Sequence, residues 1–219
     1  MPKGFSEREK ELIRARLLEN GRRAFSTYGL RKTSVEDLTR AIGISKGAFY
    51  IFYDSKEALF MDVVEGVERD FRRQVLAEVE RPGPTPRARL KHILQVAFSL
   101  WKTTPILRQV TQVEYALLVE KMPPDRVQEH VQSDQEFIEE LIRRCREAGI
   151  LIKVGGEQIS GLMYAIFFVS LHEDDIAPGM FPATMDVLLE LIAAYCVGEV
   201  SAESGIQGQA ADEEAAGRV

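Results

Sequence analysis

The chain has 219 residues, of which 45% are hydrophobic, and its formal net charge is −6. This composition supports a folded core and argues against a disordered chain. No segment approaches the roughly 18–20 consecutive apolar residues of a membrane span. The charged start MPKGFSEREKE lacks a secretory apolar region, so we expect a cytoplasmic protein with no membrane partner.

The first helix predicted in chain order is Ile13–Tyr28, where apolar residues recur at spacings of three and four. Gly29 is its predicted stop. Thr33 and Glu36 have the spacing of a capping box, which predicts a second helix that ends at Gly43.

Ser45 is the predicted cap of a third, short helix. Asp54 and Glu57 form another predicted capping box, at the start of a long helix that extends past Val75. The segment RPGPTP at 81–86 predicts a linker.

Proline and glycine signals mark further helices in the rest of the chain. The predicted helices are one after Thr85-Pro86 that carries the stripe Leu90–Trp101, then Ile106–Glu120, Pro124–Ala148, Gln158–Leu171 and Ala183–Val197. The predicted fold class is all-α, with about nine helices. We expect a three-helix helix-turn-helix domain at 7–66, a larger helical domain at 67–198, and an acidic, disordered tail at 199–219.

The charge is distributed unevenly along the chain. Residues 1–60 hold 12 Lys+Arg against 8 Asp+Glu, whereas the remaining residues hold 16 against 26. A basic N-terminal portion on an acidic body is typical of a nucleic-acid-binding head on a body that does not contact the nucleic acid.

Two short helices separated by a turn with glycine form the helix-turn-helix pattern, in which the second helix enters the major groove. On the helix from Ser45, the spacing directs Phe49 and Tyr53 toward the core. Lys46, Gly47 and Tyr50 lie together on the other side. Lysine can bind phosphate or a guanine edge, and a tyrosine hydroxyl can donate to phosphate. Lys56 follows a predicted helix cap and is expected to contact a phosphate.

The same region resembles the N-terminal domain of TetR-type transcriptional regulators. The matching residues are Ala24-Phe25, Gly29, Thr33-Ser34-Val35, Ala41, Gly43 to Tyr50, Tyr53 and Ser55 to Phe60. The resemblance implies a homodimer that reads a palindromic operator in double-stranded DNA. It also implies a C-terminal domain that binds a small-molecule effector and releases the DNA. Thr39 and Gly21 depart from the family's usual alanine, away from the predicted DNA face.

Pattern and resemblance together predict a set of DNA-binding residues in the helix-turn-helix region. These are Thr33, Ser34, Ser45, Lys46, Gly47, Ala48, Tyr50, Ile51 and Lys56. Three packed helices without DNA binding are the alternative interpretation of the same pattern.

Two further sites are predicted in the C-terminal part. Phe98, Trp101, Glu114 and Tyr115 are candidates for the walls of an effector pocket, with ordinary core packing as the alternative. Met163, Phe167, Leu188, Leu189 and Ile192 are candidates for a dimer interface, with burial inside their own domain as the alternative.

No cofactor or metal site is expected. Cys145 and Cys196 are far apart and form no CxxC pattern, and His92, His130 and His172 are scattered. We find no nucleophile–base spacing, phosphate loop or paired carboxylates, which argues against an all-α enzyme. A ligand-responsive repressor is therefore the first hypothesis. The alternative is a regulator controlled by a protein partner, with the acidic tail or the HEDD segment at 172–175 as its surface.

Overall fold

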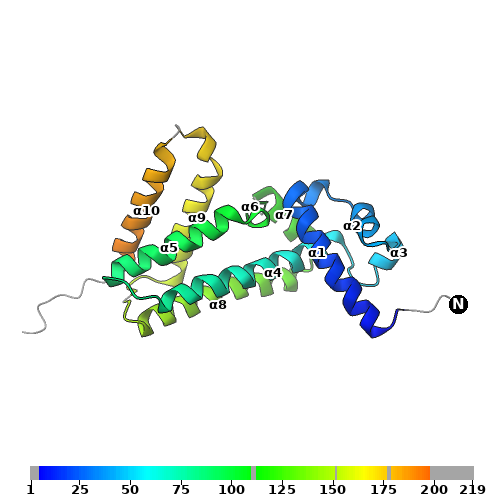
Figure 1. The fold of residues 1–219 in the computed structure, drawn as a ribbon, viewed down its shortest axis with the longest axis horizontal. Coiled ribbons are helices and arrows are strands. Elements are labelled where there is room, and N and C mark those ends of the chain that lie inside the picture. The colour runs from blue at the N-terminus through cyan, green and yellow to red at the C-terminus, as the bar shows by residue number, and fades with distance from the viewer. Residues whose placement is uncertain (1–4, 110–111, 151, 177–178, 198–219) are drawn as a thin grey trace, which may run out of the picture.

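The computed structural model describes residues 5–109, 112–150, 152–176 and 179–197, and within these residues the chain is all-helical and elongated (Figure 1). The helices are α1 (Glu7–Lys32), α2 (Val35–Ile42), α3 (Lys46–Phe49), α4 (Lys56–Ala77), α5 (Pro86–Thr103), α6 (Pro105–Gln109), α7 (Gln112–Lys121), α8 (Pro124–Glu147), α9 (Gly156–Leu171) and α10 (Met180–Cys196). Two short 3₁₀ helices, Glu78–Glu80 and Glu173–Asp175, follow α4 and α9. The predicted all-α fold, with its N-terminal helix-turn-helix and larger helical C-terminal part, is confirmed.

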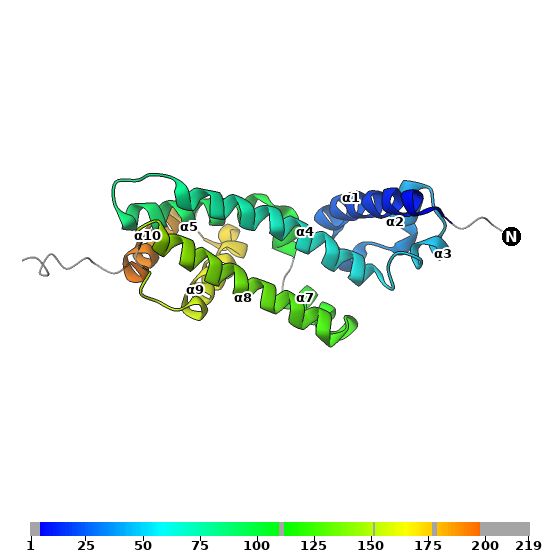
Figure 2. The same cartoon turned by 90° about the horizontal axis from the view of Figure 1, so that it is seen from below.

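Helices α1, α2 and α3 lie together at one end of the molecule, and α9 and α10 lie at the other (Figure 1). The long helix α4 connects the two ends, and α8 runs beside it (Figure 2). None of the described helices is long and apolar enough to cross a membrane.

Two hydrophobic cores divide the chain. The N-terminal core is rich in aromatic residues and includes Phe25 and Phe60, whose rings meet edge to face with centroids 5.1 Å apart. Ile106 of α6 and Leu118 of α7 also belong to this core. The second core joins the end of α4 to α5, α8, α9 and α10. The predicted boundary at 66 therefore falls inside a continuous helix, and α6 and α7 pack against the helix-turn-helix.

Gly21 lies where α1 packs closely against α4. A Cβ atom at this position would come within 3.3 Å of side-chain atoms of Phe25 and Val63. The departure from alanine at Gly21 thus has a packing reason. Thr39, the other departure, is buried and donates its hydroxyl to the Val35 carbonyl oxygen at 2.9 Å.

Both predicted capping boxes are wrong by one residue. Ser34, not Thr33, caps α2, and its hydroxyl accepts from the Asp37 backbone N–H at 3.1 Å. Ser55, not Asp54, caps α4 and accepts from the Ala58 N–H at 3.1 Å. In each pair two neighbouring residues have side chains that can cap a helix, and spacing alone does not choose between them.

Gly29 adopts a positive φ of 76°, as expected of a helix stop, although a further helical turn follows to Lys32. Gly43 also has a φ of 76° and ends α2 as predicted. The helix predicted at Ile106–Glu120 is divided into α6 and α7, with residues 110–111 outside the described chain. The last helix begins at Met180, three residues before the predicted start. The predicted tail lies outside the described residues.

Candidate nucleic-acid interface

The short helix α3 is fixed from behind by aromatic packing. Phe49, Phe52 and Tyr53 are buried, and the rings of Phe49 and Tyr53 lie 6.0 Å apart. The Ser45 hydroxyl caps the helix by accepting from the Ala48 N–H at 3.1 Å. A helix this short has little stability of its own, so its orientation depends on this core.

The opposite side of α3 is open to solvent. Tyr50 and Ile51 are 50% and 59% exposed, and the Lys46 side chain is 54% exposed. A Cβ atom added at Gly47 would meet only the Ser45 hydroxyl, at 3.9 Å, so the backbone there can be approached closely. The predicted division of α3 into a core side and an outward side is what the structure shows.

Lys46 has a partner that the sequence analysis missed. Its ammonium donates to a Glu36 carboxylate oxygen at 2.5 Å. This hydrogen bond and the carboxylate charge hold the pKa of Lys46 above its usual value. The pairing follows from the helix-turn-helix itself, because the turn at Gly43 brings the first turn of α2 beside the first turn of α3. The helix-turn-helix topology was therefore the signal from which the pairing of Glu36 with Lys46 could have been predicted.

Several other predicted contact residues have partners within the helix-turn-helix itself. Thr33 is only 3% exposed, and its hydroxyl donates to the Gly29 carbonyl oxygen at 2.8 Å. The hydroxyls of Ser34 and Ser45 serve as helix caps. Ala48 is half-buried. Among these four residues, Thr33 alone is buried, and Ser45 is exposed beside Lys46.

Lys56 has a structural role in this conformation. Its ammonium donates to the carbonyl oxygens of Leu30 at 2.8 Å and Thr33 at 2.9 Å, with Arg31 at 3.5 Å. These carbonyls lie at the end of α1, where the backbone lacks helical partners and a cation is favourable. Lys56 thus joins the start of α4 to the end of α1 through these hydrogen bonds. The predicted contact between Lys56 and a phosphate would have to replace them.

Two of the four residues predicted to line an effector pocket have side chains that the structure describes, Phe98 and Trp101. The Trp101 ring stacks on Phe167 of α9, with centroids 4.7 Å apart and planes 10° from parallel. Phe98 packs against the second core. Glu114 and Tyr115 lie in α7, and their side chains are outside the described part of the structure. The contacts of Trp101 and Phe98 agree with the alternative interpretation, in which these residues belong to the core and do not line a pocket.

The predicted dimer residues on α9 and α10 divide between the inside and the surface. Leu189 is 3% exposed and belongs to the core, which corrects its assignment to an interface. Met163, Phe167, Leu188 and Ile192 are half-buried. The outward apolar side chains of the two helices are instead Tyr164, Phe168, Val169, Val187, Leu191 and Tyr195. A shallow apolar groove of about 360 Å³ lies between the helices and is lined by residues such as Leu162, Leu191 and Tyr195.

A solvent-exposed short helix, held by an aromatic core after a glycine turn, defines the chain as a helix-turn-helix protein. Residues 17–63 match the family described as bacterial regulatory proteins, tetR family. The N-terminal part of the chain is thus similar to the DNA-binding domain of this family.

Curated relatives support this assignment over part of their length. The chain is 32% identical over 92 residues to the uncharacterized HTH-type transcriptional regulator YuxN of Bacillus subtilis (strain 168), a match that covers 42% of this chain and 30% of the relative. It is 40% identical over 70 residues to the HTH-type transcriptional repressor Rv1474c of Mycobacterium tuberculosis (strain ATCC 25618 / H37Rv), which covers 32% of this chain and 37% of the relative. The chain thus matches only about a third of the length of these relatives, which are regulators and not enzymes.

The fold as a whole also has solved counterparts. The fatty acid degradation regulator FadR from Bacillus halodurans aligns with a TM-score of 0.59 at 15% identity, covering 91% of this chain and 99% of that chain. At this identity the likeness concerns the fold alone.

Proposed function

We propose that the chain is a homodimeric transcriptional repressor that binds a palindromic DNA operator through α3 and releases it when a small apolar effector binds the helical body. Its place would be the bacterial cytoplasm, where the DNA lies. The single observation that carries the DNA-binding part is the outward surface of Lys46, Gly47, Tyr50 and Ile51 on a helix fixed by a buried core.

The chemistry of this surface suits a major groove. An ammonium can bind phosphate or the acceptor atoms of guanine, and a tyrosine hydroxyl can bind phosphate. An exposed isoleucine can contact the methyl group of thymine. Gly47 lets the backbone approach the DNA without a side chain in the way.

The outward apolar surface of α9 and α10 supports the proposal of a homodimer. These helices lie at the end of the molecule remote from α3 (Figure 1). Large contiguous apolar surfaces are rare on monomers, and two copies of a helix pair can cover each other as an isologous four-helix contact. Such a dimer presents two copies of α3 and calls for an operator with two half-sites.

The proposal that an effector releases the DNA rests on α4, which is one continuous helix between the two ends of the molecule. This helix starts at Lys56, a few residues after α3, and near its other end Val75 belongs to the second core. A ligand that prefers a shifted position of α4 would change the spacing between the two recognition helices. A difference in ligand affinity of about 1–3 kcal/mol between the two arrangements weakens DNA binding about 5–150-fold.

Selection of bound duplexes from a random DNA library tests the proposal directly. We expect enrichment of a two-fold symmetric sequence whose half-sites are about one helical turn, or a multiple of it, apart. Enrichment of an asymmetric sequence would contradict the proposed homodimer. Absence of any enriched sequence would contradict sequence-specific DNA binding. The selected duplex then serves as the probe for effector screening with apolar compounds.

A further inference from the structure

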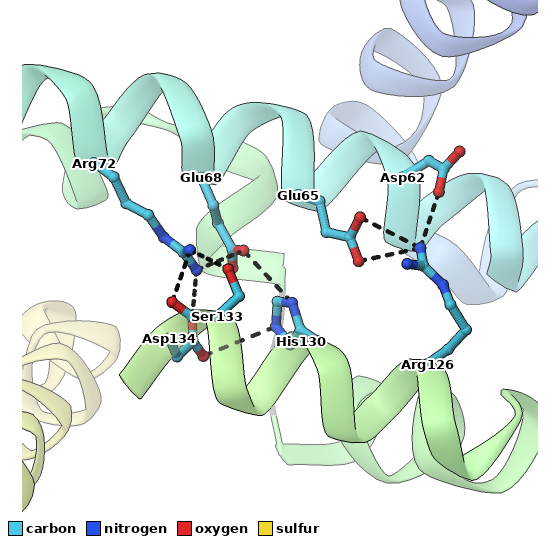
Figure 3. A network of polar contacts seen from close by, with 8 residues as sticks. All are labelled: Asp62, Glu65, Glu68, Arg72, Arg126, His130, Ser133 and Asp134. Atoms are coloured by element: carbon cyan, nitrogen blue, oxygen red, sulfur yellow. Dashed lines mark hydrogen bonds and ion pairs between the residues drawn. The ribbon is translucent and has the colours of Figure 1, made fainter. Parts of the chain in front are cut away.

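Figure 3 shows polar and ionised side chains that join α4 to α8. Nearer the DNA-binding end, Arg126 of α8 binds Asp62 and Glu65 of α4, each at 3.1 Å. One to two helical turns further along α4, Arg72, Glu68, His130, Ser133 and Asp134 form a second cluster. We call these two groups together the α4–α8 seam.

Arg72 is the centre of the second cluster. It donates to the backbone carbonyl oxygen of Ser133 at 3.1 Å and to its hydroxyl at 2.6 Å. The guanidinium also contacts Asp134 at 2.5 Å and Glu68 at 3.5 Å. Because the Arg72 side chain is mostly buried, these contacts are poorly screened by water.

His130 lies between the two carboxylates. Its Nδ1 is 3.7 Å from Glu68 Oε2, and its Nε2 is 3.9 Å from Asp134 Oδ2, while its side chain is only 12% exposed. A neutral imidazole has one N–H and one bare nitrogen, whereas an imidazolium has two N–H donors. With both carboxylates ionised and the ring neutral, the bare nitrogen faces a negatively charged oxygen. A proton on Glu68 removes the charge of one of the two carboxylates that flank the ring.

The charge balance of the seam also favours a proton. Its two arginines face four carboxylates, Asp62, Glu65, Glu68 and Asp134. Of the charged groups next to the seam, Arg69 of α4 is exposed, and Glu129 of α8 adds a negative charge beside Arg126. Negative charge is therefore in excess around Glu68 on both helices.

We propose that the Glu68 carboxyl, packed against Arg72 and His130, is a proton-binding site between α4 and α8 that is occupied at neutral pH and emptied in mildly alkaline solution. The proposal goes beyond the regulatory function, because it concerns the attachment of α4 to the body whether or not DNA is bound.

The pKa of Glu68 agrees with this site. Burial, followed by the charge of Asp134, raises it from 4.5 to about 8, while Arg72 acts in the opposite direction. In the unfolded chain the same carboxyl loses its proton near its ordinary value. The stability that the bound proton contributes is therefore complete below about pH 4.5 and is lost as the pH rises through about 8.

A metal ion is the rival occupant of this cluster. Glu68, His130 and Asp134 bring possible ligand atoms within 4.8 Å of one another. The two imidazole nitrogens, however, face different carboxylates, and one ring nitrogen alone would bind a single ion. The Arg72 guanidinium already supplies a cation to both carboxylates. The geometry thus favours a proton.

Thermal unfolding between about pH 6 and about pH 9 tests the site. We expect the Tm of the wild type to fall over this range by at least about 3 °C more than that of Glu68→Gln, whose amide imitates the protonated carboxyl. Asp70→Asn is the matched control, since Asp70 also lies on α4 but pairs with the exposed Arg73, away from the seam. This control should keep the pH dependence of the wild type. An undiminished fall in Glu68→Gln, or its loss in Asp70→Asn, would overturn the proposal.

Infrared spectroscopy gives a second measurement that needs no stable variant. The wild type at neutral pH should show the carbonyl stretch of a protonated carboxyl, and this band should disappear by about pH 9. Absence of the band at neutral pH contradicts the site. Addition of Zn²⁺ at one equivalent should leave the wild-type Tm unchanged. A rise that Glu68→Gln abolishes would identify a metal site instead.

Discussion

The Lys46 ammonium and the Glu36 carboxylate lie 2.5 Å apart across the turn that joins α2 to α3. Both side chains are half-exposed, so the pair can open without unfolding any part of the domain. If Lys46 binds DNA, it exchanges this carboxylate for a phosphate or a base edge. In that case Glu36 and the DNA compete for the same cation.

Replacing Glu36 by alanine should strengthen binding to the selected operator. The substitution frees Lys46 and removes a negative charge from a surface that faces phosphates, and we expect affinity to rise about twofold to fivefold at low salt. Fluorescence anisotropy with labelled duplex measures it. Glu136→Ala, an exposed carboxylate on α8, is the control and should change little. Weaker binding by Glu36→Ala would mean that the carboxylate itself reads a base.

Lys46→Ala and Tyr50→Phe should weaken operator binding and leave the Tm nearly unchanged. Both side chains are exposed, so their removal costs little packing. If Lys46 contacts a phosphate, the slope of log affinity against log salt should become shallower by about one unit. An unaltered affinity for Tyr50→Phe would show that the hydroxyl is not a contact.

Lys56→Met should lower stability more than a surface lysine would. The change removes an ammonium that donates to the Leu30 and Thr33 carbonyls at the end of α1. We expect a loss of about 1–3 kcal/mol in the free energy of unfolding, measured by denaturant titration. Arg73→Met removes an exposed pair with Asp70 and should cost far less. Equal losses for both variants would contradict the fastening role of Lys56.

The paired substitution Phe168→Glu and Leu191→Glu should give a folded monomer. Both side chains are exposed on the outward surface of α9 and α10, so they can accept a charge in the monomer but not in an apolar contact between copies. Sedimentation velocity gives the mass. Val119→Glu on α7, another exposed apolar site, is the control and should remain dimeric. A dimer in the double variant would place the interface elsewhere.

Trp101→Ala should destabilise the body by about 3 kcal/mol, at the low end for truncation of an aromatic residue because the side chain is only half-buried. The lost contact is the stack on Phe167. Denaturant unfolding followed by circular dichroism measures the change. If the variant instead has wild-type stability and releases DNA less in response to effector, Trp101 would line the effector pocket as predicted.

The outward side of α3 was predictable in part, because residues four positions apart, such as Lys46 and Tyr50, lie on one face of a helix. Spacing alone does not set Phe49 opposite Lys46, since the two are three positions apart. The burial of Phe49 follows from its apolar aromatic ring, which packs in the N-terminal core. The role of Lys56 was not predictable, because its carbonyl partners lie some 25 residues earlier in the chain and are backbone groups with no sequence signal. Leu189 was placed wrongly for another reason. Helix α10 is apolar on nearly all sides, so periodicity cannot tell its inner residues from its outer ones.

The stack of Trp101 on Phe167 also has a spectroscopic consequence. The chain has a single tryptophan, so all of its tryptophan fluorescence arises at the contact between α5 and α9. Emission wavelength and quenching therefore report on this one place in the body, without a dye or an engineered label. A signal change on addition of a compound would locate its effect in the second core, whereas a change caused by DNA alone would show that the far end of the molecule responds to the operator.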